Sequence, residues 1–203
     1  CPLCLSGFVF DPLVKGERAL FGTSGQLWKS NLVMYDRKTE SLWSQILGEA
    51  IVGEMAGTRL ALLPSDLIRY GEWKELNPQG EVLSRETGVS RFYGDNPYGD
   101  YFQPTDLALA WARTIDPRLA PGELVYGVVI SGQAKAYPAS LAKARGELID
   151  TFQGRTFVLR HERDLDVVRM SERRPDGTLE RINPFSAFWF SWAAAHPNTE
   201  LYQ

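Results

Sequence analysis

Residues 30–45 read SNLVMYDRKTESLWSQ, and this stretch decides the fold class. Apolar and polar residues alternate on both sides of the polar segment RKTE, which is typical of two antiparallel strands joined by a turn. The alternation places Leu32 and Met34 on one face of the first strand and Asn31 and Tyr35 on the other. The stretch therefore predicts a β-hairpin.

Short extended patterns continue outward from this hairpin. Upstream, GFVFD and RALFG flank a segment with Gly at its turn, and downstream AIVG and TRLALLP add more extended chain. The apolar period then changes in residues 65–78, SDLIRYGEWKELNP, which predict a helix. Ser65 is the candidate for its N-terminal cap, and Pro78 stops it.

The C-terminal part repeats this order of strands followed by one helix. The segments ELVYGVVI, AKAYP, LIDTF, RTFVLRHE and LDVVRM predict strands. Residues 185–197, FSAFWFSWAAAHP, predict a helix with Phe185, Phe188, Trp189 and Trp192 on one face. Between the two parts, residues 85–123 form a Gly-, Pro- and Tyr-rich region that lacks either period and predicts a long loop.

The two helix ends share a pattern. WKELNPQGEVL and WAAAHPNTELY each have Trp, then Asn or His before Pro, then Glu and an apolar pair. Further upstream, the segments that begin with CPLC and with HERD share a short tetrad, a strand, a Gly turn and a returning strand, so His161 corresponds to Cys1. We interpret the chain as a tandem duplication with half-repeats of about residues 1–84 and 124–203.

The expected fold is therefore a single α+β domain over residues 1–203. Its core is strand-rich and mostly antiparallel, and it consists of two related halves that are each closed by an aromatic helix. The second half has a hairpin and a strand ahead of His161, whereas this chain has nothing ahead of Cys1. We expect the corresponding segment to precede Cys1 in the intact protein.

The composition excludes some classes of partner. The 203 residues are 44% hydrophobic and 23% charged, which is ordinary for a folded domain. The net charge is −3 and the pI is about 5.5, so we expect no nucleic-acid partner. No run of about 18 apolar residues occurs, so no transmembrane segment is expected. The expected partner is a small ligand or a metal ion, and the oligomeric state is open.

Cys1 and Cys4 are the only cysteines, and their spacing allows three interpretations. Two thiolates three residues apart suit a soft metal ion such as copper or zinc. A closed zinc site needs four ligands, and His161 would approach Cys1 if the halves are related by a twofold axis. A redox pair is the second interpretation, but a strand follows the motif, where such pairs usually open a helix. A structural disulfide is the third.

Other polar and aromatic side chains are candidates for a binding site. In the hairpin they are Asn31, Tyr35, Trp43 and Gln45, which offer donors, acceptors and an aromatic face. In the loop region they include Arg91 and Tyr93, because arginines among tyrosines bind carboxylates or phosphates. The alternatives are a hairpin packed by its aromatic residues and a well-ordered loop. His196, at a helix end, is expected to be a capping residue.

Four segments are particular enough to resemble a known family: residues 1–53, VLSRETGVSRFYGDNPYGDY, AKAYP and FWFSWAAAHPNTELY. Together they resemble the DUF3179 family of bacterial and archaeal proteins, over essentially the whole chain. The resemblance implies that an AYP-type segment and a strand precede CPLC. It also implies a location outside the cytoplasm, periplasmic or lipid-anchored. It implies no activity, because the function of the family is unassigned.

Our functional hypothesis is an exported protein that binds copper or zinc through Cys1 and Cys4, with His161 as a further ligand. The alternatives are an enzyme that uses the same thiols, for redox exchange or for cleaving a bond to a thiophilic atom, and a structural module with a Cys1–Cys4 disulfide. No acid–base pair or nucleophile motif identifies catalytic residues, so whether the protein is an enzyme stays open. We expect the site where the CPLC turn, the hairpin and the Tyr-rich loop meet.

Overall fold

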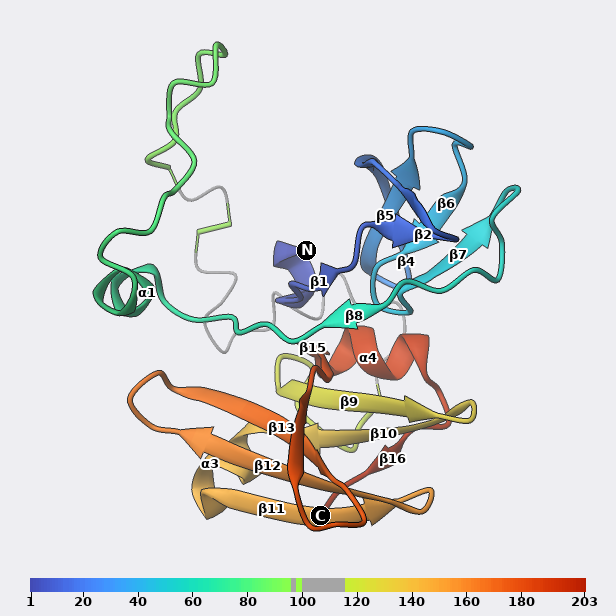
Figure 1. Cartoon of the computed structure of the whole chain (residues 1–203), viewed down its shortest axis with the longest axis vertical. Coiled ribbons are helices and arrows are strands. Elements are labelled where there is room, and N and C mark those ends of the chain that lie inside the picture. The colour runs from blue at the N-terminus through green and yellow to red at the C-terminus, as the bar shows by residue number, and fades with distance from the viewer. Residues whose placement is uncertain (96–97, 100–115) are drawn as a thin grey trace.

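A computed structural model describes residues 1–95, 98–99 and 116–203. These residues are rich in strand, with three α-helices, and the sheets are antiparallel apart from one parallel pair. The α+β class predicted from the sequence is confirmed. Figure 1 shows an N-terminal group of strands and a larger C-terminal group, with one helix between them.

The predicted hairpin lies at the centre of the N-terminal sheet. Its strands are β5 (Asn31–Asp36) and β6 (Leu42–Ser44), which pair antiparallel with Met34 opposite Trp43. The strands β4 (Phe21–Trp28) and β7 (Glu49–Val52) flank them, in the order β4-β5-β6-β7. Each strand therefore pairs with its neighbour in the chain, as the alternating pattern predicts.

Chain ahead of this sheet folds differently from the prediction. A 3₁₀ turn, η1 (Pro2–Cys4), leads to β1 (Val9–Phe10), which pairs with β8 (Leu62–Leu63). The short hairpin of β2 (Leu13–Val14) and β3 (Glu17–Arg18) is separate. The expected pairing of GFVFD with RALFG is wrong, because β1 pairs with a distant strand and the second segment begins β4.

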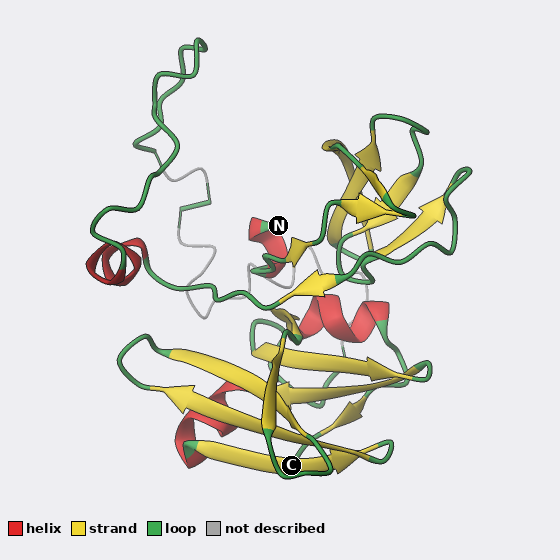
Figure 2. Cartoon of the chain, in the orientation of Figure 1, coloured by secondary structure: helices red, strands yellow, loops and turns green. Residues whose placement is uncertain are grey.

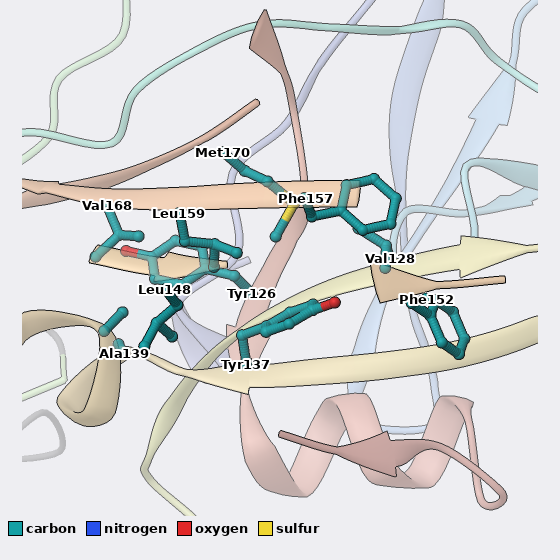
Figure 3. Packing of buried hydrophobic residues seen from close by; sticks show 11 residues of the cluster. Tyr126, Val128, Tyr137, Ala139, Leu148, Phe152, Phe157, Leu159, Val168 and Met170 are labelled. Carbon is teal, nitrogen blue, oxygen red and sulfur yellow. The ribbon is translucent and has the colours of Figure 1, made fainter. Parts of the chain in front are cut away.

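Two four-stranded sheets form the C-terminal part. One has the order β15-β9-β10-β16, with β15 (Phe185–Phe188), β9 (Leu124–Ile130), β10 (Gln133–Pro138) and β16 (Glu200–Leu201). The other is a meander of β11 (Glu147–Phe152), β12 (Arg155–Glu162), β13 (Val167–Arg173) and β14 (Leu179–Ile182). The buried residues of one cluster, including Tyr126, Tyr137, Phe157 and Met170, fill the space between them (Figure 3).

The helix α4 (Trp189–Ala195) lies between the two groups of strands (Figure 1). Trp189 and Trp192 pack against Val125, Ala134 and Ala136 on the outer face of the β9–β10 hairpin, and the same cluster includes Ile46 from the N-terminal part. Alternation along β9 explains this arrangement, because successive side chains enter the inner and the outer cluster in turn. The helix therefore joins the two groups through one apolar cluster.

Two helix predictions need correction, and one helix was missed. The helix expected over residues 65–78 begins only at Tyr70, as α1 (Tyr70–Leu76), and the residues before it form an extended linker. The helix expected over residues 185–197 is a strand, β15, followed by α4, because β15 pairs with β9 and the helix begins at Trp189. The sequence patterns also missed α3 (Ala139–Arg145), a short helix that covers one end of the two sheets.

Residues 77–95 contain no helix or strand (Figure 2). This agrees with the predicted loop over residues 85–95, which belong to both ranges. The predicted loop region of residues 85–123 lies partly outside the described residues. Over the part of the chain that the structure describes, no helix has both the length and the apolar character needed to cross a bilayer.

Candidate functional site

The two cysteines lie on one turn of chain. Pro2 begins the 3₁₀ turn η1, Cys1 is its cap and Cys4 is its last residue. The turn brings the two cysteines, three residues apart in the sequence, into one cluster of packed side chains. Leu5 follows in the left-handed conformation, with φ of 48°, and turns the chain away. Both thiols are free.

Asn31 of β5 fixes the surroundings of the Cys4 sulfur. The Asn31 side-chain Oδ1 accepts a hydrogen bond from the Ile46 backbone N–H at 3.0 Å, which determines how the amide is oriented. Its Nδ2 must then face the turn, where it donates to Cys4 Sγ at 3.0 Å and to Ser6 Oγ at 3.2 Å. Cys4 and Asn31 are both fully buried. A fixed donor at the sulfur stabilises negative charge on it.

Ser6 and Gln45 extend this network. Ser6 Oγ lies 3.2 Å from Cys4 Sγ and donates to Gln45 Oε1 at 2.8 Å. A hydroxyl has one hydrogen, so while Ser6 donates to Gln45 it does not donate to Cys4, and the single hydrogen of the Cys4 thiol is shared between Ser6 Oγ and the Cys1 carbonyl oxygen, which lies 3.6 Å from Cys4 Sγ. A reversed Gln45 amide would release the Ser6 hydrogen for the sulfur. The network is therefore compatible with either a thiol or a charged sulfur at Cys4.

Apolar side chains cover the rest of the turn. Cys4 packs with Phe188 and Phe190 from the region of α4, and Cys1 packs against the same cluster. Cys1 is partly exposed, whereas Cys4 has no exposed surface. Tyr98, from the Tyr-rich loop, also packs against this cluster. The CPLC turn, the hairpin and one residue of the loop thus meet, and that their meeting point is a functional site stays a prediction.

Trp43 and Asp36 form a separate buried pair. The Trp43 indole Nε1 donates to Asp36 Oδ2 at 2.9 Å, and Thr39 and Lys38 donate to the same carboxylate. Burial alone would raise the pKa of the Asp36 carboxyl, but the hydrogen bonds from Trp43, Thr39 and Lys38 outweigh it, and the pKa is lowered. Asp36 therefore orders the β5–β6 turn, and its contacts do not include the cysteines.

The structure places Tyr35 against the neighbouring strand. A Cβ added at Gly22 of β4 would come within 2.6 Å of the Tyr35 ring, so the ring lies directly on that glycine. The Arg37 guanidinium lies 5.9 Å from the centre of the same ring. These contacts join Tyr35 to β4, whereas Asn31 and Gln45 contact the CPLC turn.

Arg91 and Tyr93 lie in the exposed loop that follows α1. The Tyr93 hydroxyl is 2.6 Å from Thr87 Oγ1, and its side chain is 44% exposed. Figure 1 shows this segment extending away from both groups of strands. The structure does not bring these two residues to the cysteines.

His161 of β12 contacts the turn after its own strand. Its Nε2 lies 3.0 Å from Asp166 Oδ1, and Lys143 forms an ion pair with Asp166 at 2.7 Å. Hydrogen bonds from Lys143 and then His161 lower the pKa of the Asp166 carboxyl. Within residues 1–95, 98–99 and 116–203, no group of three or more His, Cys, Asp or Glu side chains is arranged to hold a metal ion.

A small cavity lies between the chain that follows the CPLC turn and Asp166. The cavity, of about 160 Å³, is lined by Leu5 and Gly7 as well as by Lys143 and Asp166. His161 contacts Asp166 but is not among the residues that line the cavity. The predicted contact between His161 and the cysteines stays a prediction.

The family model described as Protein of unknown function (DUF3179) matches residues 1–199. The chain belongs to the DUF3179 family. Searches of curated proteins and of solved structures gave no match. For this DUF3179 chain, the activity must therefore be argued from the site itself.

The site of this DUF3179 chain pairs one partly exposed thiol with one buried thiol that has a fixed amide donor. Thiols in such a pair can bind a thiophilic ion or exchange with a disulfide. Sequence patterns identified Cys1, Cys4, Asn31 and Gln45 but missed Ser6. The signal for Ser6 was its position two residues after Cys4, in a turn where a hydroxyl reaches a neighbouring side chain.

Proposed function

We propose that this protein binds a single soft metal ion, copper(I), through the thiolates of Cys1 and Cys4. The observation that carries the proposal is the short turn that holds two free cysteines in one cluster of packed side chains. Thiolates are the ligands that copper(I) prefers. The Asn31 donor at Cys4 Sγ supports a negative sulfur in a buried position.

Copper(I) fits this turn better than zinc does. Zinc in a structural site is bound by four ligands, and among the described residues no larger cluster of His, Cys, Asp and Glu accompanies the thiols. Copper(I) accepts two thiolates alone, and the apolar side chains of Phe188 and Phe190 would exclude water from one side of the ion. His161 as a third ligand remains a separate part of the proposal.

Titration with copper(I) under anaerobic conditions tests the proposal. The reduced protein competes with a coloured copper(I) chelator, and bound metal is measured after desalting. We expect one copper ion per chain for the natural sequence and none for Cys1→Ser or Cys4→Ser. Ser keeps the size of Cys at position 4 and can still pair with Asn31 and Ser6, so the fold should persist.

Two controls make this titration decisive. Ser41→Ala removes a buried hydroxyl just before β6, away from the cysteines, and should leave copper binding unchanged. His161→Gln weakens binding only if His161 is a ligand. Equal copper content in the natural protein and in Cys4→Ser would contradict the proposal.

A second candidate function is dithiol–disulfide exchange. The unequal exposure of the two free thiols favours it, because Cys1 is accessible and Cys4 is buried beside it. Cys1 would attack a substrate disulfide and form a mixed disulfide, releasing one substrate thiol. Cys4 would then displace the second substrate thiol, leaving a Cys1–Cys4 disulfide.

Mass spectrometry after treatment with glutathione disulfide tests this candidate. We expect a loss of two hydrogens from the natural protein and a stable glutathione adduct on Cys1 in Cys4→Ser. Alkylation of the reduced protein should label Cys1 before Cys4. Equal alkylation rates, with no disulfide formed, would exclude this candidate. A disulfide that forms but exchanges with no substrate would favour the remaining alternative, a structural module with a Cys1–Cys4 disulfide.

Two further proposals concern the protein as a whole. We infer that residues 1–84 and 124–203 are related halves, which is supported by the matching ends of α1 and α4. We also propose a location outside the cytoplasm, which is supported by the family resemblance alone. Fractionation of the native cells and detection of the protein outside the cytoplasm test that location.

A further inference from the structure

Residues 70–83, which comprise α1 and the apolar segment after it, lie apart from the sheets (Figures 1 and 2). The helix has no buried residue. The exposed fractions are 56% for Tyr70, 60% for Leu76 and 58% for Val82, and Leu83 is fully exposed. A run of exposed apolar side chains of this kind marks an interaction surface.

This unit has an internal counterpart in α4 and β16. Both helices have seven residues, and both end on a backbone N–H that donates to the carbonyl of the Trp four residues earlier. The capping residues have nearly the same backbone angles: φ −129° and ψ 65° at Asn77, and φ −127° and ψ 73° at His196. The two segments are therefore the same local structure.

The contact after the helix end is also similar in the two units. A Cβ added at Gly80 would lie 2.5 Å from the Trp73 ring, so the chain folds back over that ring. At the corresponding position, Thr199 Oγ1 accepts a hydrogen bond from Trp192 Nε1 at 3.0 Å. In both units the residue seven positions after the Trp contacts its ring.

Only the second unit has a partner among the described residues. Six of the seven α4 residues are buried, and the helix lies on the β9–β10 hairpin. Trp192 fits there because position 127 is glycine: a Cβ at Gly127 would lie 2.2 Å from its ring. After the helix, β16 pairs parallel with β10, and the Tyr202 N–H donates to the Ala136 carbonyl at 2.9 Å.

The order of elements indicates where a partner for α1 comes from. In the second half, the β9–β10 hairpin precedes His161. In the proposed duplication, His161 is the counterpart of Cys1. A hairpin equivalent to β9–β10 would therefore precede Cys1. We infer that residues 70–83 bind a β-hairpin with a small-residue face, supplied by a segment of this polypeptide N-terminal to Cys1.

In this arrangement α1 covers the face of that hairpin and residues 81–83 add a parallel strand to its edge. Leu83 corresponds to Tyr202, whose N–H donates to a backbone carbonyl of β10. The Leu83 N–H would likewise donate to a backbone carbonyl of the bound hairpin. The inference rests on the two related halves proposed above. It does not depend on the thiols.

The linker before α1 is already fixed to the C-terminal sheets. Asp66 forms ion pairs with Arg169 at 2.8 Å and with Arg181 at 2.6 Å. Asn183 donates to the Leu63 carbonyl and to Ser65 Oγ. The helix therefore starts from a defined point, four residues beyond Asp66, which limits where its partner can lie.

Hydrogen exchange on the protein expressed from its intact gene tests the inference. We expect the amides of Glu81 and Leu83 to exchange about 100-fold more slowly than unstructured amides, because they correspond to Glu200 and Tyr202 on the side of β16 that faces β10. Val89 and Phe92, which are exposed in the same loop, should exchange at the unprotected rate. Unprotected exchange at Glu81 and Leu83 would overturn the inference and leave the thiol proposal unaffected.

A photoreactive amino acid at position 83 identifies the partner directly. We expect crosslinks within one chain, to residues that precede Cys1, and the same amino acid at position 89 should give none of these. Crosslinks between two chains, or protection that is lost on dilution, would assign the surface to a second copy and contradict the inference. Leu83→Pro should remove the protection of the Glu81 amide, whereas Val89→Pro should preserve it.

Discussion

Asn31 is the single residue on which most polar contacts around Cys4 depend. Its side chain accepts from the Ile46 N–H and donates to Cys4 and Ser6, so three elements of the chain meet at one amide. Sequence alternation identified Asn31 as a candidate, because a polar residue in an otherwise apolar strand has to find a partner. It could not identify Ser6, whose role depends on the left-handed turn at Leu5.

Replacing Asn31 by Ala should destabilise the protein by about 1–3 kcal/mol, because buried partners lose their hydrogen bonds. The Ile46 N–H and the Ser6 hydroxyl are buried, so they cannot form replacement hydrogen bonds with water. Urea unfolding measures the change. Asn198→Ala, at an exposed position, should change the stability by less than about 0.5 kcal/mol. Equal effects from the two variants would show that the Asn31 network contributes nothing.

His196 should make the stability of the protein depend on pH. Burial lowers the pKa of its imidazole from 6.5 to about 4, and its Nε2 has no hydrogen-bond partner within the described part of the chain. Below pH 6.5 the unfolded chain binds a proton that the folded protein cannot bind until about pH 4. Stability should therefore fall by up to about 3 kcal/mol as the pH is lowered across this range.

The measurement is the difference between the natural protein and His196→Gln, since other groups titrate in the same range. Unfolding in urea at several pH values between 7 and 4 gives both curves. We expect the difference between them to shrink with decreasing pH, because the variant lacks the penalty. Parallel curves would show that the ring is accessible to protons in the folded state.

The helix α4 shows what a periodic pattern can and cannot predict for an element. The spacing of Phe185, Phe188, Trp189 and Trp192 is helical, but the first two residues belong to β15. Aromatic residues suit strands as well as helices, so only the pairing of β15 with β9 decides between them. The hairpin of residues 30–45 was predictable because its alternation, its turn and its partner strand all lie within one short stretch.

Side-chain roles within the hairpin were less predictable than its strands. Alternation placed Asn31 and Tyr35 on the same face, yet Asn31 contacts the CPLC turn and Tyr35 covers Gly22. The register between β4 and β5 shifts between Thr23 and Leu27, so the two ends of β5 have different neighbours. A single sequence does not reveal such an irregularity.

Gly127 in β9 should tolerate no larger side chain. A Cβ there would lie 2.2 Å from the Trp192 ring, and the ring is fully buried and cannot move aside. Gly127→Ala should therefore cost about 1–3 kcal/mol, the usual effect of overpacking a core. Thermal unfolding followed by tryptophan fluorescence measures this. Gly122→Ala, where a Cβ meets no atom within 4 Å, is the matched control and should be nearly neutral.

On the scale of the whole molecule, two kinds of contact join the N-terminal strands to the C-terminal sheets among the described residues. One is apolar, where Ile46 packs with Trp189 and Trp192 of α4. The other is polar, where the linker after β8 reaches Arg169 and Arg181 through Asp66. The sequence predicted neither contact, because both join residues that are more than 100 positions apart and no local pattern marks them. The CPLC turn lies beside both, so its geometry depends on how the two groups are held.

Asp66→Ala should loosen the linker without disrupting either group of strands. The change removes a carboxylate that pairs with two guanidinium groups and leaves their positive charges facing each other. A loss of about 1.4 kcal/mol in local stability corresponds to a tenfold larger population of the open linker. Trypsin should then cleave after Arg69 about tenfold faster, since cleavage in a loop follows the open population.

Glu75→Ala, at an exposed position on α1, is the control for this experiment. It removes a carboxylate that has no ion pair to the C-terminal sheets, and it should leave the cleavage rate unchanged. If both variants are cleaved at the natural rate, the Asp66 contact does not hold the linker, and the other contacts between the two groups of strands suffice to hold them together.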